Sequence, residues 1–65
     1  MREKLMYLDL ELELEDIVTS AQRAIYICEH FLPEDKNIVI PFIELRNKAI
    51  WTSAMILLEA DKHKL

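Results

Sequence analysis

The chain has 65 residues and a formal net charge of −4, and it contains no glycine. Ordinary amino-acid usage predicts about four or five glycines in a chain of this length. Their absence excludes phosphate-binding loops, dinucleotide-binding fingerprints and tight hairpin turns, because each of these needs a residue that tolerates a positive φ. The eight Lys and Arg residues are scattered among twelve acids. The chain therefore lacks the basic stripe of a nucleic-acid-binding protein, and we expect no direct nucleic-acid binding.

The size of the chain allows one domain with a marginal core. A chain of about 60 residues buries only about 60% of its unfolded surface, and small domains compensate with disulfides, metals or oligomerisation. The single cysteine excludes an intramolecular disulfide framework and indicates a reducing compartment. Oligomerisation is then the expected compensation. No apolar run approaches the roughly 18 residues of a membrane span, so we expect a cytoplasmic protein with no membrane partner.

A first helix is predicted from about residue 5 to residue 31. Its apolar residues are spaced alternately by three and four, which is the spacing of a heptad seam. They are Tyr7, Leu10, Leu14, Ile17, Ala21, Ala24, Cys28 and Phe31, and Val18, Ile25 and Leu32 widen the seam on one side. The helix should end near Phe31, because Pro33 disfavours the α conformation in the residue before it.

Residues 8–15 leave a second interpretation open. Four leucines alternate there with acids, which is the period of a half-buried strand. Leu and Glu are strong helix formers and Asp and Glu are poor strand formers, so the composition favours helix. With a strand, the order strand-helix-helix would resemble a ribbon-helix-helix repressor, but the outward acids would be repelled by DNA phosphates.

A second helix is predicted from about residue 41 to residue 62, after a polar connector over residues 32–40. Pro41 suits the first turn of a helix, where its missing N–H costs nothing. The second helix has two apolar faces. One holds Ile43, Ile50, Trp51, Ala54, Leu57 and Leu58, and the other holds Phe42, Leu45, Ala49, Ile56 and Ala60. One face should pack on the first helix, and the other most simply packs on a second copy of the chain.

These elements predict an all-α protein, a single antiparallel helical hairpin over residues 1–65 that dimerises into a four-helix bundle. Trp51 should lie near the small residues Ala21 and Ala24. Ten residues are expected in the core or in the dimer contact. They are Leu14, Ile17, Ala21, Ala24, Phe42, Ala49, Ile50, Trp51, Ile56 and Leu57.

The chemistry-bearing residues predict neither a catalytic site nor a metal or cofactor site. Cys28 and His30 are two residues apart, so on a helix they do not face each other. Glu59 and His63 are four residues apart and supply only two metal ligands, which is too few for a site. We therefore expect a protein that is not an enzyme.

The predicted function is protein binding by a small regulator or inhibitor, a kind of small acidic helical protein that is common on phages and other mobile elements. Large apolar residues mixed with Tyr and Arg lie on the first helix opposite its core seam, as at interaction surfaces. With two acids from the run over residues 9–16, the predicted partner-binding residues are Leu8, Leu12, Arg23, Tyr26, His30, Glu11 and Glu15. The alternatives are an acidic nucleic-acid mimic that blocks a DNA- or RNA-binding enzyme, and a structural subunit of a larger helical assembly.

Overall fold

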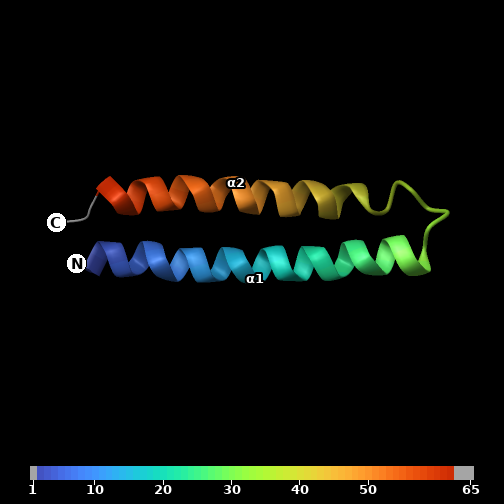
Figure 1. Ribbon diagram of the computed structural model, residues 1–65, viewed down its shortest axis with the longest axis horizontal. Coiled ribbons are helices and arrows are strands. Elements are labelled where there is room, and N and C mark those ends of the chain that lie inside the picture. The colour runs from blue at the N-terminus through green and yellow to red at the C-terminus, as the bar shows by residue number, and fades with distance from the viewer. Residues whose placement is uncertain (1, 63–65) are drawn as a thin grey trace.

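Two long helices form an antiparallel hairpin in the computed structural model, which describes residues 2–62 (Figure 1). Helix α1 spans Arg2–Phe31 and helix α2 spans Ile40–Lys62. The prediction of an all-α helical hairpin is confirmed. Residues 8–15 are helical, so the strand alternative is wrong. Helix α1 begins about three residues earlier than predicted, and both ends at the connector agree with the prediction to within one residue.

Helix α1 is uninterrupted because none of its thirty residues is Gly or Pro and many are strong helix formers. Its last turn is closed by the Leu32 N–H, which donates to the Cys28 carbonyl at 3.0 Å. Leu32 itself precedes Pro33 and leaves the helical conformation. The proline therefore sets the end of α1, as the sequence predicts.

The connector is held by local hydrogen bonds. The Ile38 N–H donates to Asp35 Oδ1 at 3.3 Å, and the Asp35 N–H donates to the Leu32 carbonyl at 3.2 Å. The Val39 carbonyl accepts the N–H groups of Phe42 and Ile43 at 3.1 Å each, which starts α2. Within residues 2–62 no residue has a positive φ. The connector thus reverses the chain without the left-handed conformation that glycine usually supplies.

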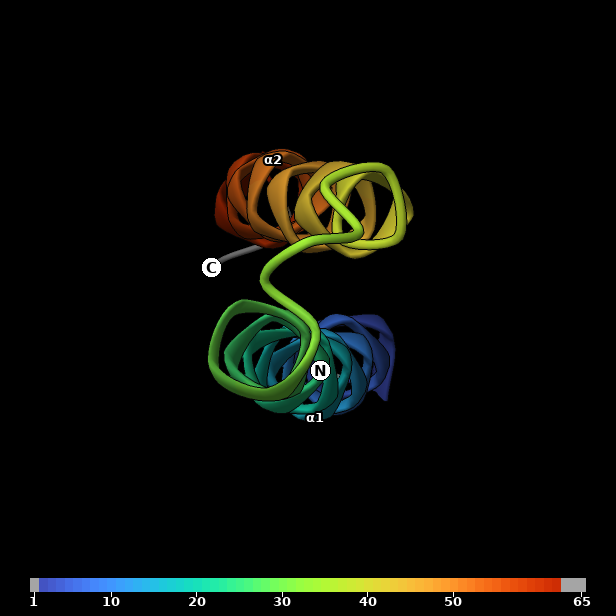
Figure 2. The ribbon, with the colours of Figure 1, turned by 90° about the vertical axis from the view of Figure 1, so that its right-hand side faces the viewer.

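The hairpin is a thin rod. Its Cα atoms extend over 52 × 14 × 10 Å, and their radius of gyration is 15.1 Å. A compact domain of this length has a radius of gyration of about 11 Å. Seen from the connector end, the helices form two layers whose axes are inclined to each other (Figure 2). Over residues 2–62, neither helix contains a segment long and apolar enough to cross a membrane.

The contact between the helices is narrow and uses small residues. On α1 the buried or half-buried side chains follow heptad spacing and are Tyr7, Glu11, Leu14, Val18, Ala21, Ala24, Ile25 and Cys28. On α2 they are Phe42, Ile43, Arg46, Ala49, Thr52, Ser53, Ile56, Glu59 and Ala60. Among the described residues five are buried, and three of these are alanines, namely Ala21, Ala49 and Ala60. Among the described residues no large side chain is completely buried, so the hairpin has only a shallow core of its own.

The predicted seam of α1 is only half correct. One of its rows, Tyr7, Leu14, Ala21 and Cys28, does face α2. In the other row Leu10, Ile17 and Phe31 are exposed and only Ala24 is half-buried. Of the residues predicted to widen the seam, Val18 and Ile25 lie in the contact, in one row with Glu11, while Leu32 is exposed. The row of Tyr7 can combine with the row of Leu10 or with the row of Val18, because both combinations have heptad spacing. In the structure α2 packs on the Val18 side.

The expected position of Trp51 against Ala21 and Ala24 is wrong. Trp51 is 66% exposed, whereas Ala49 and Ala21 are 5% and 2% exposed. Side chains two positions apart on a helix point in directions that differ by about 200°. Helix α2 therefore cannot direct both Ala49 and Trp51 at α1. Alanine at the contact lets the two backbones approach more closely than tryptophan would.

Candidate protein-binding surfaces

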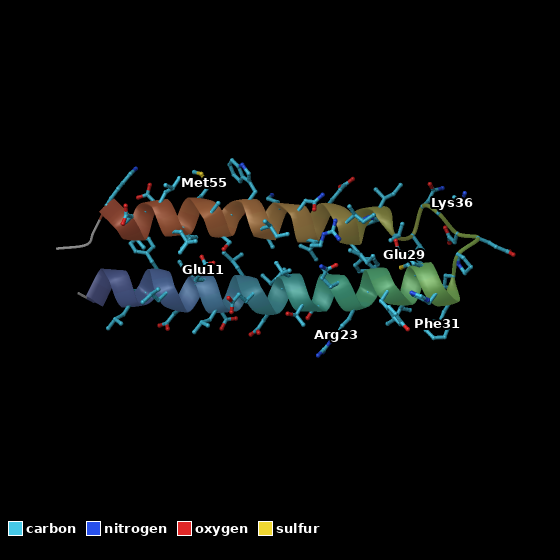
Figure 3. All side chains as sticks on the ribbon, viewed as in Figure 1. Glu11, Arg23, Glu29, Phe31, Lys36 and Met55 are labelled. Atoms are coloured by element: carbon cyan, nitrogen blue, oxygen red, sulfur yellow. The ribbon has the colours of Figure 1, made fainter. Side chains whose placement is uncertain are left out.

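One side of helix α1 faces away from α2 and carries two groups of predicted partner-binding residues about 16 Å apart along the helix. We name this side the outer ridge. It consists of Leu8, Leu12, Arg23, Tyr26 and His30, and all five side chains are exposed. Leu12 and Tyr26 are 60% and 56% exposed. The Arg23 side chain points away from α2 (Figure 3). Five of the seven residues that the sequence predicts as partner-binding thus share one side of α1.

The aromatic end of the outer ridge is ordered by ring contacts. Tyr26 and His30 are one helical turn apart, and their rings stack with centroids 4.1 Å apart and an interplanar angle of 29°. The Phe31 ring meets Tyr26 edge-on, at 6.5 Å and 67°. Phe31 was expected in the core seam and not on this surface. Its place at the last residue of α1, next to the connector, is the signal that could have indicated exposure.

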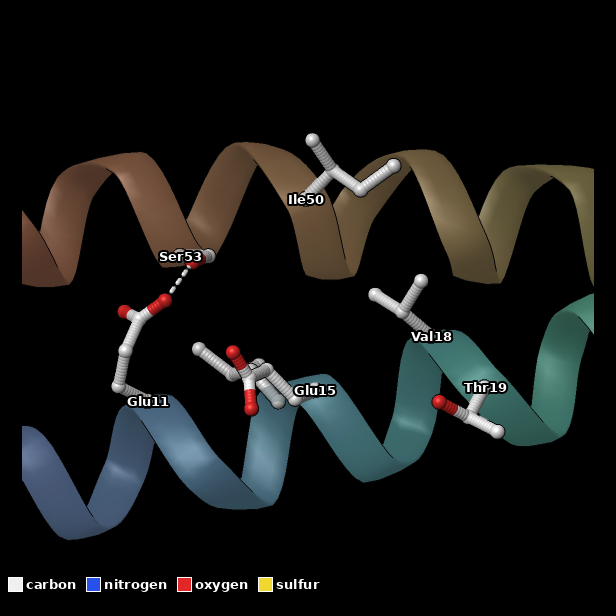
Figure 4. A pocket seen from close by; sticks show the side chains of 7 residues that line it. Glu11, Glu15, Val18, Thr19, Ile50 and Ser53 are labelled. Carbon is white, nitrogen blue, oxygen red and sulfur yellow. Dashed lines mark hydrogen bonds between the residues drawn. The ribbon is translucent and has the colours of Figure 1, made fainter.

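Glu11 does not belong to the outer ridge, because it faces α2 (Figures 3 and 4). Its Oε1 accepts a hydrogen bond from the Ser53 hydroxyl, and its Oε2 is buried with no hydrogen-bond partner. The heptad row that contains Val18 and Ile25 explains this orientation, since Glu11 occupies the same row one repeat earlier. Glu15 is exposed beside the contact. Of the two predicted acids, only Glu15 is placed where a partner could reach it freely.

An open pocket of about 400 Å³ lies between the helices at this point (Figure 4). Its lining consists of Glu11, Leu14, Glu15, Val18, Thr19, Ile50 and Ser53. The lining offers two carboxylates and two hydroxyls among aliphatic side chains, and it contains no His, Lys, Arg or Cys. Searching the described residues finds no group of three or more His, Cys, Asp or Glu side chains that could hold a metal ion.

Cys28 and His30 do not form a pair. The Cys28 thiol is buried against α2, while His30 lies on the outer ridge and stacks on Tyr26. This separation follows from their two-residue spacing on a helix. The Glu59 and His63 pair, predicted from the sequence to supply too few ligands for a metal site, is not described as a pair, since His63 lies outside the described residues. Glu59 accepts from the Lys62 ammonium at 3.1 Å within the same helix.

Helix α2 carries a second uncovered surface, which we name the α2 stripe. It consists of Ile50, Trp51, Ala54, Leu57 and Leu58, and all five are exposed. These residues belong to the first apolar face predicted for this helix. The other predicted face supplies the contact with α1 through Phe42, Ala49, Ile56 and Ala60, while Leu45 on that face is exposed.

The two helices differ in charge. Helix α1 contains seven acids and three Lys or Arg residues, whereas α2 contains three of each. Residues 49–58 of α2 form an uncharged run of ten. The outer ridge therefore lies on an acidic helix, and the α2 stripe lies on a helix with no net charge.

Comparison of the chain with protein-family models, curated proteins and solved structures found no match.

Proposed function

We propose that this protein is a non-enzymatic regulator or inhibitor that acts as a homodimer and binds another protein through the outer ridge of α1. The observation that carries the proposal is the ordered Tyr26–His30 stack on a face that α2 leaves uncovered. Tyr and Arg are the residue types that contribute most often to binding hot spots. Arg23 and Tyr26 lie on this face, and Leu8 and Leu12 lie on the same side of α1 about 16 Å or more nearer its N-terminus.

The ring contacts lower the cost of binding. An interface side chain loses about 0.5–1.5 kcal/mol of conformational freedom when a partner immobilises it. The Tyr26 ring already contacts His30 and Phe31 in the free hairpin, so a partner has less freedom to remove. A preorganised aromatic side chain of this kind is stronger support for a specific binding surface than scattered exposed leucines would be.

The homodimer is supported by the surface area of the hairpin. The chain exposes 5447 Å², whereas a compact folded monomer of its mass exposes about 4,300 Å². The excess of about 1,100 Å² is comparable with the roughly 800 Å² that each partner buries in a standard interface. We propose that two hairpins bury this surplus in a four-helix bundle.

The nucleic-acid mimic receives less support. A mimic needs carboxylates in a row, and Glu11 turns inward to Ser53. The remaining acids of the run, Asp9, Glu13, Glu15 and Asp16, are exposed but spread around more than one side of α1. A structural subunit of a larger helical assembly would also show an uncovered α2 stripe, and the mass of the purified protein distinguishes it from a homodimer. The cytoplasmic location and the phage or mobile-element origin stay predictions.

The test is a pair of substitutions on the outer ridge, Leu12→Asp with Tyr26→Asp. The wild-type protein, immobilised, is used to isolate a partner from a lysate of the source cell, and the retained partner is then quantified with each variant. We expect the double variant to lose about 2 kcal/mol or more of binding, a loss of at least about thirtyfold in affinity. Far-UV circular dichroism and light scattering should be unchanged.

A matched control carries the same added charge on another exposed side of α1, as Ser20→Asp with Ile27→Asp. It should retain the partner. Loss of helicity in the Leu12 and Tyr26 variant would place these residues in a core and contradict the proposal. Loss of the partner only when Glu13 and Glu15 are changed to Gln would instead indicate the mimic.

A further inference from the structure

The α2 stripe has a nearly symmetric arrangement about its smallest residue. Ala54 stands at the centre, with Ile50 and Trp51 three and four residues before it and Leu57 and Leu58 three and four residues after it. These spacings place the two large pairs one helical turn above and one below Ala54 on the same side of α2. The exposed fractions of the outermost pair, Trp51 and Leu58, are 66% and 62%. Large, small and large side chains thus alternate along one uncovered face.

This arrangement is compatible with a two-fold axis when the second copy runs in the opposite direction. A two-fold axis at Ala54 would place each large pair against the other large pair of the partner, and Ala54 against its own copy. Small residues at the crossing point allow helix axes to approach to about 8 Å. Antiparallel helices also place opposite ends of their dipoles together. A protein of different sequence would have no reason to match this symmetry.

The charges favour α2 over α1 as the contact. Two copies of α1 would bring together two helices with seven acids and three Lys or Arg residues each, whereas α2 has equal numbers of each sign. Residues 49–58 would enter the contact without desolvating a single charge. Burying charges costs free energy unless they are paired.

We infer that a second copy of this chain packs on the α2 stripe, with the two α2 helices antiparallel and crossing at Ala54. This inference rests on the homodimer of the proposed function and specifies its geometry. Ala54 is five residues beyond the buried Ala49 and points about 140° away from it. The stripe therefore lies on a different side of α2 from α1. In the dimer the two α2 helices form the centre and the two outer ridges face outward, so each dimer carries two partner sites.

Disulfide crosslinking tests the geometry. All variants carry Cys28→Ala, which removes the buried native thiol, and are oxidised with diamide and run on non-reducing gels. Ala54→Cys places two thiols at the crossing point, where helix axes about 9–10 Å apart put the two Cα atoms about 5 Å apart, within disulfide range. We expect covalent dimer at a rate at least about tenfold above that of Thr19→Cys on the exposed side of α1, because a specific contact raises the local thiol concentration into the millimolar range.

Ile50→Cys is the matched control for direction. In the antiparallel dimer the two copies of residue 50 are about 12 Å apart along the helices, too far for a disulfide. In a parallel dimer they are adjacent. Ile50→Cys should therefore crosslink no faster than Thr19→Cys. Circular dichroism of each reduced variant verifies that it is folded.

The outcomes separate this inference from the proposed homodimer. Rapid crosslinking through Ile50→Cys would overturn the antiparallel geometry. Crosslinking through Thr19→Cys, without crosslinking through Ala54→Cys, would overturn the α2 contact and leave the homodimer intact. A monomer in light scattering of the wild-type protein would overturn both.

Discussion

At the residue scale, the contact between α1 and α2 depends on small and polar side chains. Ala21, Ala49 and Ala60 let the helices approach, and Glu11 stands in a row that is otherwise apolar. The Ser53 hydroxyl satisfies one Glu11 oxygen and leaves the other without a hydrogen-bond partner. A buried acceptor without a partner costs stability. Glu11 therefore lowers the stability of the hairpin relative to an apolar residue at the same heptad position.

Replacing the pair Glu11 and Ser53 with Leu and Ala should stabilise the protein. Glu11→Leu extends the apolar row of Val18 and Ile25, and Ser53→Ala removes the hydroxyl that would lose its acceptor. We expect the free energy of unfolding to rise by about 1 kcal/mol, measured by urea denaturation.

Glu15→Leu is the matched control for this pair, because it makes the same change at an exposed position of α1. It should alter stability by less than about 0.5 kcal/mol. A double variant less stable than wild type, with a neutral control, would show that the Glu11–Ser53 hydrogen bond outweighs the cost of burying the carboxylate.

At the scale of the elements, the ends at the connector are decided locally. Pro33 ends α1, and Pro41 fits the first turn of α2, so both boundaries can be predicted from the sequence. The Asp35 carboxylate accepts a hydrogen bond from the Ile38 N–H, and this bond was not predicted from the sequence. Asp commonly makes such bonds to the N–H two or three residues on, and this propensity is the signal that could have found it.

Asp35→Ala should destabilise the connector, because the Ile38 N–H loses its acceptor. We expect a loss of about 0.5–1 kcal/mol in the free energy of unfolding. Asp35→Asn retains the side-chain oxygen and should stay close to wild type. Equal losses in both variants would assign the effect to the charge, and no loss in either would show that water replaces the bond.

At the scale of the whole molecule, the hairpin buries less surface than a compact domain of its size does. Its radius of gyration of 15.1 Å and its exposed area of 5447 Å² both exceed the values for a compact domain of this size. Large apolar side chains are exposed on both helices, with Trp51 and Phe31 at 66% and 70%. Stability should then come in part from association.

Thermal unfolding should accordingly depend on protein concentration. Dilution favours dissociated and unfolded chains by mass action. For a dimer of this size we expect the midpoint to rise by about 5 °C for each tenfold increase in concentration. Light scattering should give a mass close to twice 7.7 kDa. A midpoint that is constant with concentration would contradict coupled folding and association.

The sequence by itself determined two helices, their boundaries at Pro33 and Pro41, and their antiparallel order. Spacing alone could not choose between the rows of Leu10 and Val18 on α1, or between the two apolar faces of α2. The spacing of apolar residues shows which side chains share a face of one helix. It does not show on which face the other helix packs. The tertiary structure made that choice, because alanines on one face of α2 allow close approach to α1. That choice turns Glu11 inward and leaves Trp51 exposed.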